Sequence, residues 1–122
     1  MTGIYRLRAA EGSAPEPLFP GEHYLLKGTD GPAWHEGRLY TIQNGTHPMR
    51  MSEVDPGAGT AVEGIRVALD RALESYGEPT TGIVHQKSVY YIVNSPWGYY
   101  GDDRRPHEDG WPPARIHRYD IR

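Results

Sequence analysis

Six histidines are the residues of this chain best suited to acid–base or metal chemistry: His23, His35, His47, His85, His107 and His117. None of them stands at the His-x-His, His-Glu-x-x-His or His-x3-His spacing that places metal ligands side by side. The chain also has no cysteine, which excludes thiol nucleophiles, cysteine-based zinc sites and iron–sulfur clusters. The sequence therefore predicts neither a metal site nor a cofactor.

One set of titratable residues would fit a small hydrolase or nuclease-like enzyme. His85 lies on a predicted strand beside apolar residues, where an imidazole can exchange a proton near neutral pH. Arg104 and Arg105 precede His107, and these three side chains could hold a phosphate. Glu53 is the candidate carboxylate partner. In the competing interpretation the histidines are hydrogen-bonded strand residues, and the loop charges neutralise one another in solvent.

The stretch from 95 to 113, SPWGYYGDDRRPHEDGWPP, carries two tryptophans, two tyrosines, four prolines and three glycines. Such a composition disfavours both helix and strand. Trp and Tyr provide large, rigid contact areas and are favoured at recognition surfaces. The predicted ligand-binding residues are therefore the aromatic and basic side chains of this loop: Trp97, Tyr99, Tyr100, Arg104, Arg105 and Trp111.

The sequence is compatible with two roles for this loop. It either caps the sheet or forms a ligand-facing surface. Trp97 directly follows a predicted central strand, so we expect it at the edge of the core. Trp111 lies beyond the charged turn, and we expect it on the ligand-facing side with Tyr99 or Tyr100.

Residues 38–51 form the clearest predicted hairpin. Asn44-Gly45 separates two alternating runs, and this dipeptide favours a two-residue turn. The resulting register pairs Gln43 with Thr46, and it places Tyr40, Ile42, His47, Met49 and Met51 on one apolar face.

Residues 60–76 are predicted to form the one main helix. Thr60 and Glu63 have the spacing of a capping box, and Gly77 with Pro79 would end the helix. Apolar residues recur at helical spacing in between: Val62, Ile65, Leu69, Ala72, Leu73 and Tyr76.

The remaining periodic segments predict strands over 3–9, 23–28, 82–93 and 114–121. The third of these is either one strand or a hairpin about Gln86-Lys87, and the run VYYIV within it is apolar on both faces, which is typical of a central strand. Together the elements predict a single α+β domain over 1–122. Its antiparallel sheet has five to six strands, with the helix packed on one face.

The charge and hydrophobicity of the chain limit the classes of partner that it can bind. The chain has 122 residues, a formal net charge of −3 and no apolar run of membrane-spanning length. This balance argues against nucleic acid and against an anionic membrane as partners. No signal peptide is visible, and arginine dominates the basic residues. We therefore expect a cytoplasmic protein from a bacterium with a GC-rich genome.

The favoured function is a small recognition module of the immunity or inhibitor type. It would bind a protein or a small ligand through the aromatic loop and the adjacent end of the sheet. The alternatives are the hydrolase or nuclease-like enzyme and a small biosynthetic enzyme with a pocket lined by Tyr and Trp. The sequence leaves the oligomeric state open.

Overall fold

The computed structural model describes residues 3–22, 24–59, 62, 64–71, 77–103, 105 and 112–122, with the backbone alone for 67–71. In these ranges the regular secondary structure is almost entirely β-strand. The strands are β1 (Tyr5–Arg6), β2 (Glu16–Pro17), β3 (Thr29–His35), β4 (Arg38–Gln43), β5 (Arg50–Asp55), β6 (Gly64–Arg71), β7 (Gly82–His85), β8 (Ser88–Ile92) and β9 (Ile116–Asp120). One short 3-10 helix, η1, spans Pro96–Tyr99.

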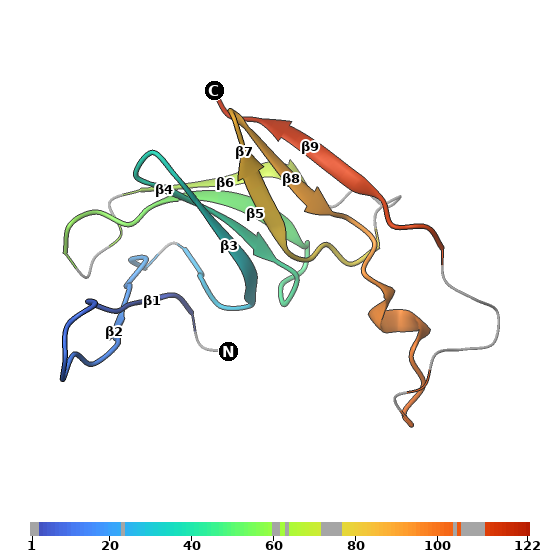
Figure 1. Ribbon diagram of the computed structural model, residues 1–122, viewed down its shortest axis with the longest axis horizontal. Helices are drawn as coiled ribbons and strands as arrows, with labels where there is room; N and C mark the ends of the chain where they lie inside the picture. The colour runs from blue at the N-terminus through green and yellow to red at the C-terminus, as the bar shows by residue number, and fades with distance from the viewer. Residues whose placement is uncertain are drawn as a thin grey trace.

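The strands form three antiparallel sheets with the orders β1-β2, β3-β4-β5-β6 and β7-β8-β9. The three-stranded sheet lies across the four-stranded sheet, and the two meet where β7 runs beside β3 (Figure 1). The backbones approach closely at this junction, because a Cβ on Gly31 would lie 2.8 Å from the Cα of Thr81. Glycine at position 31 thus lets the two sheets share one core.

The four-stranded sheet is covered on both faces. One face packs against the three-stranded sheet through a cluster of Tyr40, Ile42, Met51, Val89, Tyr91 and Val93. The opposite face packs Val54 against Leu18 and Leu26 of the N-terminal segment. Neighbouring side chains of a strand point to opposite faces, and so β4 and β5 contribute to both clusters.

Gln43 attaches the N-terminal segment to the sheet from a buried position. Its amide nitrogen donates to the carbonyl oxygens of Leu25, at 2.8 Å, and Lys27, at 3.0 Å. Its amide oxygen accepts from Arg50 Nε, at 2.9 Å, and from Ser52 Oγ, at 3.4 Å. This hydrogen bonding offsets the cost of burying a polar side chain on a face that the sequence pattern marked as polar.

The predicted helix over 60–76 is wrong, and with it the α+β class. Residues 64–71 form β6, which pairs with β5 so that Ile65 lies opposite Val54 and Arg66 opposite Glu53. Gly64 disfavours a helix and β-branched residues such as Ile65 favour a strand, while the edge of β5 gains a hydrogen-bonded partner. The predicted cap at Thr60 and Glu63, and residues 72–76, lie outside the described residues. Nor is there one sheet of five to six strands; the described strands divide among three sheets.

The hairpin over 38–51 is confirmed, but its two-residue turn is wrong. Gln43 pairs with Arg50 and Ile42 with Met51, so the connection runs from 44 to 49. Pro48 has no N–H for the ladder, which explains why pairing begins only beyond it. The nitrogen of Gly45 instead donates to the oxygen of Gly28, at 3.3 Å. The predicted apolar face of Tyr40, Ile42, His47, Met49 and Met51 is confirmed in part, since Tyr40, Ile42 and Met51 share one cluster, while His47 and Met49 lie in the connection.

The C-terminal strands are confirmed. β7 and β8 form a hairpin about Gln86-Lys87 in which His85 pairs with Ser88, and Gln86 has a φ of 55°. β8 is the central strand of its sheet, and β9 follows within the predicted range. The predicted strand over 23–28 is wrong in its described residues, because β3 begins at Thr29. Among the described helical residues, none forms a segment long and apolar enough to cross a bilayer.

Candidate functional site

The outward face of the three-stranded sheet is open and carries an apolar area. Val89, Tyr91 and Val93 fill the shared core, so the alternate residues of β8 point away from it. Tyr90 and Ile92 therefore lie outward, beside Ile83 of β7 and Ile116 of β9. Ile83 and Ile116 are 65% and 69% exposed. We call Ile83, Tyr90, Ile92 and Ile116 the outer apolar face.

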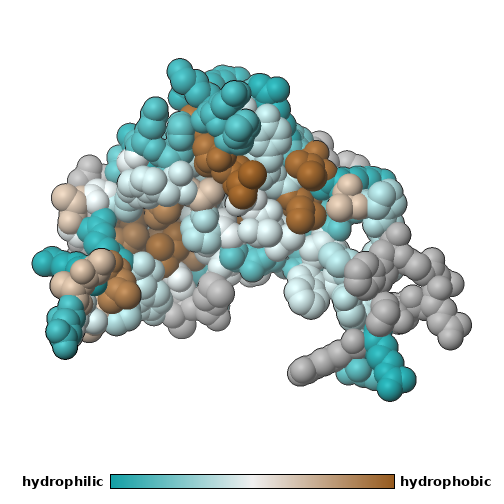
Figure 2. Space-filling view, viewed as in Figure 1, coloured by the Kyte–Doolittle hydropathy of each residue, from teal (hydrophilic) through white to brown (hydrophobic). Residues whose placement is uncertain are grey.

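A shallow hollow of about 240 Å³ lies on this face, and its lining includes Gly82. A Cβ on Gly82 would lie 2.6 Å from the carbonyl oxygen of Tyr90 and 2.7 Å from the Cβ of Tyr91. Glycine at this position therefore lets β7 pair closely with β8. Figure 2 shows hydrophobic surface in this region, with a second hydrophobic area beside β1 and β2.

Three residues separate the end of β8 from the aromatic turn η1. Trp97 is 64% exposed, and its ring lies 5.9 Å from that of Tyr100 at an angle of 41°. The expectation that Trp97 lies at the core edge is therefore wrong. After β8 the chain turns away from the core before it reaches Trp97. The backbone nitrogen of Ser95 holds this turn, because it donates to the carbonyl oxygen of Glu78, at 2.8 Å. Tyr99 is also exposed.

Asn94 clamps the two ends of the loop together. Its Nδ2 donates to the carbonyl oxygen of Pro113, at 3.0 Å, and its Oδ1 accepts from the nitrogen of Arg115, at 2.6 Å. The nitrogen of Val93 also donates to the oxygen of Arg115, at 3.0 Å. These bonds fix the aromatic turn relative to the start of β9, next to Ile116.

The basic residues predicted for this loop are only partly described. Arg105 is exposed, its Nε lies 3.8 Å from Asp103 Oδ2, and its backbone nitrogen donates to Asp103 Oδ1, at 3.0 Å. The arginine is thus paired within its own loop, and such an exposed pair contributes little stability. Arg104, His107 and Trp111 lie outside the described residues.

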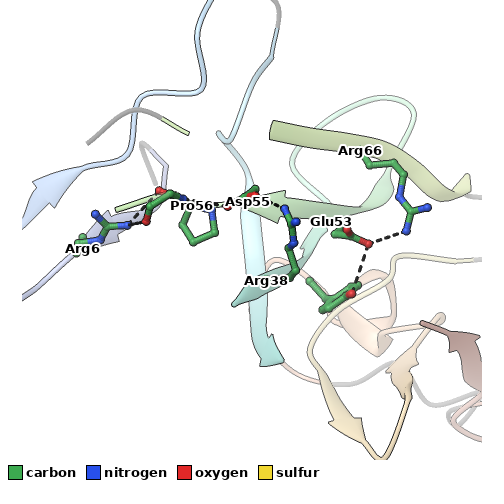
Figure 3. A network of polar contacts seen from close by, with 8 residues as sticks. Arg6, Arg38, Glu53, Asp55, Pro56 and Arg66 are labelled. Atoms are coloured by element: carbon green, nitrogen blue, oxygen red, sulfur yellow. Dashed lines mark hydrogen bonds and ion pairs between the residues drawn. The ribbon is translucent and has the colours of Figure 1, made fainter. Parts of the chain in front are cut away.

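Glu53 belongs to a polar network on the four-stranded sheet (Figure 3). Its carboxylate accepts from Arg66, at 2.6 Å, and from the hydroxyl of Tyr40, at 3.4 Å. Arg38 and Asp55 form a neighbouring ion pair. Burial and the charge of Glu53 raise the pKa of Tyr40 to about 12, and the hydrogen bond to Glu53 raises the pKa of Arg66. The Glu53 carboxylate is therefore engaged by two donors.

Glu53 and His85 are not brought together. His85 is exposed at the end of β7, where its ring lies 6.5 Å from that of Tyr90, and Glu53 is on the other sheet. No hydrogen bond or ion pair found in the described part of the chain joins them. In that same part, no three His, Asp or Glu side chains cluster in a way that could hold a metal ion.

The apolar residues of the outer apolar face could be recognised in the sequence. The run VYYIV is apolar on both faces, which predicts cover on both sides, yet among the described residues the side with Val89 and Tyr91 is the covered one. Ile83 and Ile116 are apolar residues that alternate with inward-facing neighbours on the flanking strands. Their exposure follows from the absence of a helix that could cover them in the described residues.

A second exposed apolar surface lies at the N-terminal segment. It surrounds a hollow of about 270 Å³ near β1 and β2, and it includes Tyr5, Phe19, Tyr24 and Leu25. No sequence motif marked these residues.

Comparison with known proteins adds no relative: the chain matches no protein family model, no curated protein and no solved structure.

Proposed function

We propose that this protein is a small recognition module, of the immunity or inhibitor type, that binds a protein partner. The contact surface is the outer apolar face together with the aromatic turn η1. The observation that carries the proposal is the exposure of Ile83, Ile116 and Trp97, each more than 60% exposed, on one C-terminal substructure.

Exposed apolar side chains gathered on one face are typical of interaction surfaces. Tryptophan and tyrosine are the residues that most often carry binding energy at such surfaces. A sheet face and a turn clamped by Asn94 are already ordered, so little conformational entropy is lost on binding.

A protein partner fits this surface better than a small ligand. Small-ligand sites enclose most of their ligand, whereas the hollow beside Ile83 and Ile116 is shallow and lies on an open sheet face. The enzymatic alternative needs Glu53, His85 and His107 to converge. Glu53 is instead held by Arg66 and Tyr40, so the described residues give that alternative no geometric support.

The test is affinity capture from extracts of the source cells, followed by calorimetry with the captured protein. Trp97→Ala and Ile116→Ser should each weaken binding at least tenfold, which corresponds to about 1.4 kcal/mol. Their free energies of unfolding should change by no more than about 0.5 kcal/mol, because both side chains are exposed.

Trp34→Ala provides the matched control, since Trp34 is 61% exposed on β3 and lies outside the proposed surface. It should leave binding unchanged. Equal retention of the captured protein by all three variants would refute the proposed surface.

A further inference from the structure

β9 is an open edge of its sheet. β7, at the other side of the sheet, runs beside β3, whereas β9 has β8 as its one neighbour among the described strands. The backbone nitrogen of Val93 donates to the carbonyl oxygen of Arg115, at 3.0 Å, and the backbone nitrogen of Ile121 donates to the carbonyl oxygen of Lys87, at 2.9 Å. These bonds set the alternation of the ladder. Odd-numbered residues of β9 bond to β8, and the N–H and C=O groups of Ile116, Arg118 and Asp120 point to the open side.

Among the described residues, this edge has no proline, lysine or bulge that would prevent pairing. Natural edge strands are protected by proline, by charged side chains (above all lysine), by a bulge, by being short or by a covering segment. β9 is short and charged, but its two charges are of opposite sign, so a second copy of the strand can match them. β9 reads Ile-His-Arg-Tyr-Asp, pairs with β8 in regular register, and lies at the rim of the molecule (Figure 1). Its backbone is therefore ready to accept a further strand.

The side chains along the edge carry opposite charges two residues apart. Arg118 Nε donates to Asp120 Oδ1, at 2.7 Å, and Ser88 Oγ donates to the same oxygen, at 2.7 Å. The hydrogen bonds from Ser88 and Arg118 lower the pKa of Asp120, and Asp120 raises that of Arg118. Both side chains are exposed and share one face of the sheet.

We propose that β9 pairs with β9 of a second copy of this chain, antiparallel, about a two-fold axis at Tyr119. The outward-pointing backbone groups must face one another, which permits only a few registers. A register centred on Arg118 would set two arginines opposite each other, and like charges in that position destabilise a sheet. A register centred on His117 would set Arg118 opposite Ile116.

The register centred on Tyr119 is the one in which the charges match. Arg118 of each copy lies opposite Asp120 of the other, so two ion pairs form across the new ladder. The two three-stranded sheets then become one six-stranded sheet. Because the two-fold axis is perpendicular to that sheet, both outer apolar faces lie on the same side. This dimer does not depend on the proposed protein partner.

The role of the two charges is tested by sedimentation equilibrium. A contact between two five-residue strands is small, so its dissociation constant is expected to be roughly micromolar or weaker. The measurement therefore covers a concentration series. The wild type should form dimers. Arg118→Asp and Asp120→Arg alone should each raise the dissociation constant at least tenfold, because each sets like charges opposite each other. An equimolar mixture of the two variants should recover dimerisation, since the hybrid pairs restore opposite charges.

The hybrid recovery excludes a merely structural effect, because neither variant is repaired within its own chain. Circular dichroism should show that both variants remain folded. A wild type that stays monomeric throughout the series would overturn the proposal, as would single variants that dimerise like the wild type.

The register has its own readout, because the chain contains no cysteine. In the Tyr119→Cys variant the two substituted positions should be about 4.5 Å apart between Cα atoms, within the range of a disulfide. Mild oxidation should therefore link the dimer. The His117→Cys control should not link, since position 117 lies opposite Ile121 of the second copy. Linking from 117 and not from 119 would contradict this register.

Discussion

The Tyr40 hydroxyl makes the stability of the fold sensitive to alkali. Its pKa is raised to about 12 in the folded protein, first by burial and then by the charge of Glu53. An unfolded tyrosine has a pKa of about 10. Because the folded-state value is the higher one, the stabilisation is complete below pH 10 and is lost as the pH rises from 10 to 12.

The magnitude follows from the size of the shift. Two pKa units, at about 1.36 kcal/mol each, correspond to a loss of about 2.7 kcal/mol. The assay is urea denaturation at pH 9 to 12 of the wild type and of Tyr40→Phe, which keeps the buried ring and removes the titrating group. At pH 9 the two free energies of unfolding should differ by no more than about 1 kcal/mol, because the hydrogen bond to Glu53 is long, at 3.4 Å.

The difference between the two proteins isolates Tyr40 from the other groups that titrate in this range. The wild type should lose stability relative to Tyr40→Phe as the pH rises, and Glu53→Gln should reduce that loss without abolishing it, since burial is the larger cause. Parallel stability curves for the wild type and Tyr40→Phe would refute the reasoning.

Two further predictions concern packing. Met51→Ala should lower the free energy of unfolding by about 2–5 kcal/mol, because Met51 is buried in the cluster shared by the two sheets; thermal and urea denaturation measure this, and a loss below about 1 kcal/mol would contradict it. Gly82→Ala should destabilise by about 1–3 kcal/mol, since its Cβ would collide with Tyr90 and Tyr91. Gly98→Ala is its control and should be neutral, because its Cβ would meet nothing within 4 Å, and equal melting temperatures for the two variants would disprove the close packing of β7 on β8.

The sequence predicted elements whose signals are local. The hairpin about Gln86-Lys87 is one of the two alternatives that the sequence offers for residues 82–93, and the shared face of Tyr40, Ile42 and Met51 follows from strand alternation. Both features depend on neighbours in the chain, so both could be recognised without the fold.

The segment over 60–76 could not be assigned in this way. Its apolar residues fit a helical period, yet Ile65 also fits a strand that pairs with β5 and packs beside Val54. The choice depends on whether the edge of β5 has another partner, which no local pattern records. The exposure of Trp97 is a similar case, because it depends on the distant hydrogen bond between Ser95 and Glu78.

The same limit applies to the candidate site. Its residue types were visible in the sequence, since aromatic side chains of the 95–113 loop and apolar residues of the flanking strands stand out. Which of them face solvent depends on how the two sheets stack, and that stacking buries Tyr91 and leaves Ile83 exposed.

The clamp made by Asn94 has a consequence for engineering. The chain leaves the sheet and returns to it at one place, where Asn94 bonds to Pro113 and Arg115. The entropy of closing a loop grows only slowly with its length, so the intervening segment can be lengthened or replaced at modest cost. This position is therefore a natural site for grafting foreign peptides, with the sheet below serving as a fixed display scaffold.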